Sequence, residues 1–101
     1  MESYEKLVRD NIPEILDKKA VPYEKRIASP EEYKTELIKK LGEEVQEFLD
    51  ASGDVDELAD VIEVVEALKK LPEYQSVEEV RTKKREERGG FDARIIVKGE
   101  K

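Results

Sequence analysis

The amino-acid sequence predicts an all-α fold, in which a helical hairpin is completed to a four-helix core by dimerisation, with short extended segments at both ends. Apolar residues recur every three or four positions over 33–48 and again over 55–71, which is typical of helices with a buried face. Only a short break over 52–54 separates the two stretches, so we expect the two helices to lie antiparallel.

The first part of the chain is expected to contain one short helix between two extended segments. Residues 4–9 form the first extended segment. A helix then runs from a cap at Asn11 to about Lys19, with Glu14 placed three residues after the cap. Residues 20–28 are predicted to be extended and lead to the hairpin.

The two hairpin helices carry strong start and stop signals. Ser29, followed by a proline and two glutamates, is expected to cap a helix that runs to about Ala51. Asp54 and Glu57 offer a capping box for the next helix, which continues to about Lys70 and stops before a proline.

A fourth helix and a tail are expected to complete the chain. The helix is expected to start at Ser76, and the glycine pair at 89–90 ends it. Residues 91–98 are predicted to form a short strand or an extended tail.

The third helix is apolar around well over half of its circumference. One neighbouring helix cannot cover so wide a face, so we expect at least a homodimer, or a dimer of dimers, with a four-helix core. The apolar residues are Val55, Leu58, Ala59, Val61, Ile62, Val64, Val65, Leu68 and Leu71.

The composition excludes several classes of function. The 101 residues suffice for a single domain, 1–101, and contain neither cysteine nor histidine, which excludes thiol catalysis and imidazole metal ligands. The net charge of −7 argues against binding a nucleic acid polymer. No apolar run is long enough to cross a membrane, and residues 1–6 lack the features of a signal peptide, so we expect a cytoplasmic protein without a membrane partner.

Five acids of the hairpin form two short motifs. The first, E-E-x-x-E, contains Glu43, Glu44 and Glu47, and the second, E-x-x-D, contains Glu57 and Asp60. Spacings of three place Glu44 beside Glu47 and Glu57 beside Asp60. Both pairs lie at similar heights above the turn, since a helix rises ~1.5 Å per residue. The four carboxylates can therefore converge.

Two of these acids are predicted to point toward the core, because Glu44 and Glu57 fall in the apolar sectors of their helices. An unpaired carboxylate there is costly, and a bound cation removes the cost. Carboxylates without His or Cys favour Mg²⁺ or Mn²⁺, and Mg²⁺ usually completes its shell with water and substrate phosphates. The candidate phosphate-binding residues are Lys6, Arg9, Lys84 and Arg88.

A purely structural interpretation stays open at this point. Most of the 26 acids are expected to be solvated, and Glu57 could serve only in a capping box. Glu43 and Glu47 could lie on the surface, and the bases near Arg88 could only complement the dipole of their helix. A metal site and an acidic hairpin without a ligand both fit the pattern.

The two acidic motifs resemble those of the MazG-like all-α nucleoside triphosphate pyrophosphohydrolases, whose signature is E-E-x-x-E followed by E-x-x-D. Residues 6–13, KLVRDNIP, are similar to the opening of a small single-domain branch that is labelled phosphoribosyl-ATP pyrophosphohydrolase-like. Residues 88–91, RGGF, are similar to the end of that branch. The gap of nine residues between the two motifs is short for this family, which leaves the base specificity open.

The resemblance implies a Mg²⁺-dependent cut between the α- and β-phosphates of a nucleoside triphosphate, which yields a nucleoside monophosphate and pyrophosphate. It implies metal ligation by Glu44, Glu47, Glu57 and Asp60. Glu43 is the remaining motif acid, and whether Glu43 or Glu47 acts as the general base stays open.

The resemblance also implies roles for the basic residues. Lys84 and Arg88 are expected to face the β- and γ-phosphates, with assistance from Lys6 and Arg9. Two alternatives remain beside this activity. One is hydrolysis of phosphoribosyl-ATP, and the other is a non-enzymatic helical interaction module whose acidic hairpin docks a basic partner.

Overall fold

The computed structural model describes residues 4–100, so residues 1–3, part of the stretch predicted to lack a signal peptide, lie outside the described part. The helices confirm the all-α prediction, and no strand occurs between residues 4 and 100. For residues 91–98 the strand is therefore wrong. The segment begins with a turn, in which the Arg94 N–H donates to the Phe91 carbonyl at 3.1 Å, and continues without regular structure. The elements are α1 (Ile12–Lys18), α2 (Pro30–Asp50), α3 (Val55–Lys69), the 3₁₀ turn η1 (Pro72–Tyr74) and α4 (Val77–Arg88).

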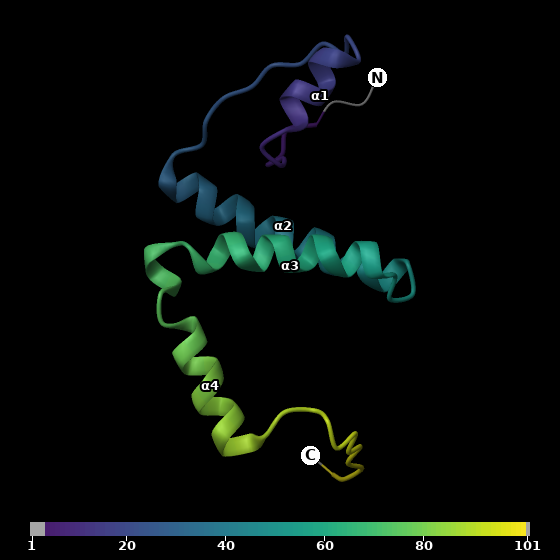
Figure 1. Cartoon of the computed structure of the whole chain (residues 1–101), viewed down its shortest axis with the longest axis vertical. Coiled ribbons are helices and arrows are strands. Elements are labelled where there is room, and N and C mark those ends of the chain that lie inside the picture. The colour runs from purple at the N-terminus through teal and green to yellow at the C-terminus, as the bar shows by residue number, and fades with distance from the viewer. Residues whose placement is uncertain (1–3, 101) are drawn as a thin grey trace.

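Helices α2 and α3 form the centre of the molecule. They run side by side as an antiparallel hairpin, while α1 and α4 lie on opposite sides of it (Figure 1). The turn between them places Ser52 and Gly53 in the left-handed region, with φ of 57° and 83°. The Gly53 N–H donates to the Phe48 carbonyl at 2.9 Å, which closes the end of α2. The polypeptide therefore reverses direction within a few residues.

The apolar core of one chain is thin. Among the described residues, Leu37 of α2 and Val64 of α3 are the buried apolar side chains. Many other apolar side chains of the hairpin remain exposed, which means that a single chain does not cover the apolar face of α3. They are Ile38, Val45, Leu49, Val55, Leu58, Ile62 and Val65.

A side-chain cap forms at one of the four expected helix starts. The Ser29 Oγ accepts the Glu32 N–H at 3.2 Å, as predicted. Asn11 and Ser76 make no side-chain cap, because their ψ angles near 0° are far from the extended backbone that a cap requires. Asp54 has extended backbone, with ψ of 140°, but its carboxylate also makes no cap hydrogen bond. The predicted cap at Asn11 and capping box at Asp54 therefore do not form, although α1, α3 and α4 begin directly after Asn11, Asp54 and Ser76 as expected.

We expect the Ser29→Ala variant to lose about 1 kcal/mol of stability, because the Glu32 N–H then loses its side-chain acceptor. Thermal unfolding followed by circular dichroism measures the effect. Ser76→Ala is the matched control, since the Ser76 side chain makes no cap hydrogen bond. Equal losses in the two variants would contradict the role given to Ser29.

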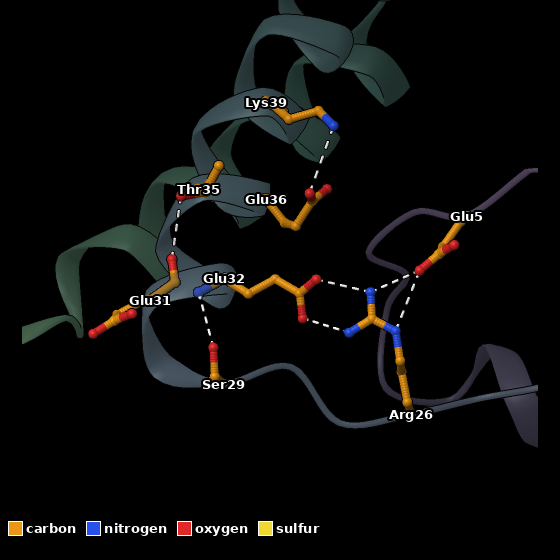
Figure 2. Close-up of polar contacts among 8 residues, drawn as sticks. All are labelled: Glu5, Arg26, Ser29, Glu31, Glu32, Thr35, Glu36 and Lys39. Atoms are coloured by element: carbon orange, nitrogen blue, oxygen red, sulfur yellow. Dashed lines mark hydrogen bonds and ion pairs between the residues drawn. The ribbon is translucent and has the colours of Figure 1, made fainter.

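An ion-pair network joins the N-terminal segment to the start of α2. The Arg26 guanidinium donates to Glu5 and to both carboxylate oxygens of Glu32 (Figure 2). The hydrogen bond from Arg26 lowers the pKa of Glu32, so the folded state favours its charged form. This contribution is present above the pKa of Glu32 in the unfolded chain and is lost as the pH falls through the lower, folded value. It is small, because the network is exposed to solvent.

The length and polarity of the helices also bear on membrane association. None of the helices formed by the described residues is both long enough and apolar enough to span a bilayer.

Candidate functional site

Three acids from the two hairpin helices come together near the turn. One carboxylate oxygen each from Glu44 of α2 and from Glu57 and Asp60 of α3 lie within 4.8 Å of one another. The antiparallel packing produces this arrangement, since the two motifs flank the same turn at similar heights. We refer to Glu44, Glu57 and Asp60 as the acidic cluster.

Burial makes the acidic cluster energetically demanding. Glu44 is 7% exposed and is the buried charged residue among those described. Its Oε1 pairs with the Lys40 Nζ at 3.3 Å, but its Oε2 is buried without any hydrogen-bond partner. The Oε2 of Glu57 is likewise buried without a partner. A buried anionic oxygen that lacks a donor loses its hydration without compensation, so these two acids reduce the stability of the folded state.

Glu47 lies at the rim of the acidic cluster. Its pKa is raised, chiefly by the polar contact with the adjacent Glu44 carboxylate and by the negative charge of Glu44, and further by burial and by the charge of Glu57. The two carboxyl groups on α2 therefore adjoin each other. Glu47 itself is exposed and lies outside the group of three converging oxygens. The structure therefore brings three of the four predicted ligands together and places the fourth beside them.

Glu43 occupies the outer side of α2. Its side chain is about half exposed, and its Oε2 lies 3.8 Å from the Lys40 Nζ. Lys40 thus reaches both Glu43 and Glu44, and only 19% of its side chain is exposed. Lys40 is not among the residues predicted from the sequence. Its spacing of three and four residues from two motif acids was the signal that could have identified it.

Of the predicted phosphate-binding residues, Arg9 is the one that reaches the acidic cluster. Its Nη2 lies 2.6 Å from the Asp60 Oδ1, across 51 residues of sequence. Lys6 instead lies over the Tyr4 ring, 5.6 Å from the ring centroid. Within residues 4–100, no ion pair joins Lys6 to the cluster acids.

Lys84 and Arg88 are fully on the surface of α4. This helix diverges from the hairpin, and its side chains are exposed along its whole length (Figure 1). Both residues line an open groove at the C-terminal end of α4, together with Arg81, Arg85 and the segment 89–92. Within one chain, the structure does not bring Lys84 and Arg88 to the acidic cluster.

The donor set of the acidic cluster suits a hard divalent cation. Three carboxylates, without a His or Cys in the chain, match the oxygen ligands that Mg²⁺ and Mn²⁺ prefer. Oxygens on opposite sides of one Mg²⁺ are ~4.2 Å apart, given Mg²⁺–oxygen distances of ~2.1 Å. The three oxygens, which lie within 4.8 Å of one another, therefore need at most a small approach to share an ion. Three protein ligands leave coordination positions for water and for phosphate oxygens.

The chain was compared with protein families, curated proteins and solved structures. No family model, no curated protein and no solved structure matches this chain.

Proposed function

We propose that the chain is a Mg²⁺-dependent nucleoside triphosphate pyrophosphohydrolase, with Mn²⁺ as an alternative ion. The observation that supports this proposal is the buried, unpartnered Oε2 of Glu44 next to the carboxylates of Glu57 and Asp60. A divalent cation is the ligand that compensates such oxygens. The two acidic motifs and their resemblance to the MazG-like enzymes then indicate which reaction the ion serves.

In the proposed site, Glu44, Glu57 and Asp60 hold the ion, and Glu47 completes the protein ligands from the rim. When bound, the ion would polarise a phosphate oxygen and lower the pKa of a bound water. Glu43 and Glu47 are the two candidates for the residue that orients or deprotonates the attacking water. We favour Glu47, because its carboxyl group adjoins Glu44 at the rim of the acidic cluster, whereas Glu43 lies on the outer side of α2 beside Lys40.

The proposed reaction adds water to the α-phosphorus and breaks its bond to the bridging oxygen of the β-phosphate. The products are a nucleoside monophosphate and pyrophosphate. Arg9 is the residue proposed to neutralise phosphate oxygens, and its contact with Asp60 supports this role. The chain has no histidine or cysteine to form a Ser-His or Cys-His pair, which favours direct attack by water over a covalent intermediate.

The proposed enzyme is a homodimer. The exposed apolar side chains of α2 and α3 form the surface that a second copy would cover to complete a four-helix core. Helix α4, which carries Lys84 and Arg88, diverges from the hairpin (Figure 1). The proposed phosphate contacts of these two residues therefore require another copy or a movement of α4.

A product assay tests the proposed function. A panel of nucleoside triphosphates, together with phosphoribosyl-ATP, is incubated with Mg²⁺ or with EDTA, and pyrophosphate and orthophosphate are measured separately. We expect Mg²⁺-dependent pyrophosphate release and none with EDTA. Orthophosphate as the first product would contradict the proposed bond cleavage. Cleavage of phosphoribosyl-ATP alone would assign that substrate instead, while no turnover and no effect of Mg²⁺ on the melting temperature would favour the interaction module.

A further inference from the structure

Arg9 forms an ion pair with Asp60, one of the ligands of the proposed metal site. Its guanidinium lies 2.6 Å from the Oδ1 of Asp60, which belongs to the acidic cluster. Both side chains are well exposed, at 56% for Arg9 and 40% for Asp60, so the ion pair can open without exposing buried surface. The contact links the segment before α1 directly to the hairpin.

A divalent cation on Asp60 and a guanidinium on the same carboxylate disfavour each other. Both are cations that draw on the same negative charge, and at a separation of a few ångströms their repulsion is substantial even in a medium of high permittivity. The ion gains additional stabilisation from the buried oxygens of Glu44 and Glu57, which the Arg9 guanidinium does not contact. The ion is therefore expected to displace Arg9.

We propose that Arg9 is an exchangeable counter-ion of the metal site. Without a divalent cation, Arg9 neutralises Asp60. When the cation binds, Arg9 leaves Asp60 and binds a phosphate of the nucleotide, because a guanidinium pairs with phosphate oxygens through two parallel hydrogen bonds. The metal site and the nucleotide site are thereby coupled, because the Arg9 guanidinium that leaves Asp60 becomes available to bind a phosphate. This inference rests on the proposed function and adds the order of binding, in which the metal ion binds first and Arg9 then binds the nucleotide.

The test measures Mn²⁺ binding to the full chain by electron paramagnetic resonance, which requires no turnover. We expect Arg9→Gln to bind Mn²⁺ about two- to five-fold more tightly than the unaltered protein, which is the range that an exposed ion pair supports. Arg26→Gln is the matched control. It removes another exposed, ion-paired arginine, one that contacts Glu5 and Glu32 rather than the acidic cluster, and should leave the Mn²⁺ affinity unchanged.

A second measurement uses a non-hydrolysable nucleoside triphosphate analogue in saturating Mg²⁺. Arg9→Gln should bind this analogue more weakly than the unaltered protein, by about ten-fold, and Arg9→Lys should recover part of the loss. Opposite changes for metal and nucleotide in the same variant support the exchange. Circular dichroism verifies that each variant is folded.

The outcomes separate this inference from the proposed function. Weaker Mn²⁺ binding in Arg9→Gln would overturn the exchange, because Arg9 would then orient Asp60 for the ion. Unchanged Mn²⁺ binding in Arg9→Gln would overturn it as well. If the unaltered protein bound no Mn²⁺, both proposals would fail. If Mn²⁺ and nucleotide binding behaved as expected but no pyrophosphate were released, the proposed reaction alone would fail.

Discussion

Replacement of Glu44 by glutamine is expected to reduce Mg²⁺-dependent pyrophosphate release by about 100-fold or more, because the variant loses the most buried ligand of the proposed metal site. The same change should stabilise the metal-free protein. It removes a buried negative charge with an unpartnered oxygen and relieves its repulsion of Glu47 and Glu57. A gain of ~1 kcal/mol would raise the melting temperature by roughly 4–8 °C in a domain of this size.

The opposite signs of these two effects distinguish a functional acid from a structural one. Glu63→Gln is the matched control, since Glu63 is an exposed acid of α3 outside the acidic cluster. It should change neither the activity nor the melting temperature appreciably. The added effect of Mg²⁺ on the melting temperature should disappear in Glu44→Gln and persist in Glu63→Gln. Retained activity in Glu44→Gln would contradict the proposed metal site.

Replacement of Ile62 by glutamate is expected to convert the proposed dimer into monomers. Ile62 lies on α3 and is 51% exposed in the single chain, within the apolar surface that a second copy would cover. In a symmetric dimer the charge enters the interface twice, and burying each unpaired carboxylate costs several kcal/mol. We expect the dimer to weaken by at least ~100-fold, which corresponds to ~3 kcal/mol. Light scattering after size exclusion measures the mass.

Ile27→Glu provides the control for the dimer experiment. Ile27 is 93% exposed in the segment before α2, outside the hairpin, so its replacement should leave the measured mass unchanged. A loss of helicity in Ile62→Glu on dilution would fit a monomer whose core is too thin to fold stably alone. If the unaltered chain were monomeric at micromolar concentration, the proposed assembly would be refuted.

The hairpin helices could be predicted from the sequence because their signals are local. α2 begins at Pro30 and ends at Asp50, within one residue of the prediction, since the Ser29 cap and the glycine turn act on neighbouring residues. The absence of side-chain caps at Asn11 and Ser76 could not be predicted in the same way. A cap also requires a particular backbone conformation, which the preceding chain determines.

The candidate site could be predicted only where helical geometry determines it. The burial of Glu44 follows from its apolar sector, and its proximity to Glu57 and Asp60 follows from two antiparallel helices. The Arg9–Asp60 contact could not be predicted, because the segment before α1 has no periodicity that would reveal its path. The separation of Lys84 and Arg88 from the cluster was also beyond prediction, since α4 lacks a broad apolar face that would dock it on the hairpin.

The short reversal at Ser52 and Gly53 has a kinetic consequence. The acids of the cluster all lie within residues 44–60, so the hairpin can close through local contacts, and such closure is fast. Closure also forces like charges together, and this repulsion slows the zipping of the two helices. Under the proposed ion binding, a divalent cation in the refolding buffer would therefore accelerate folding. The ion would promote closure of the hairpin before it served in the proposed reaction.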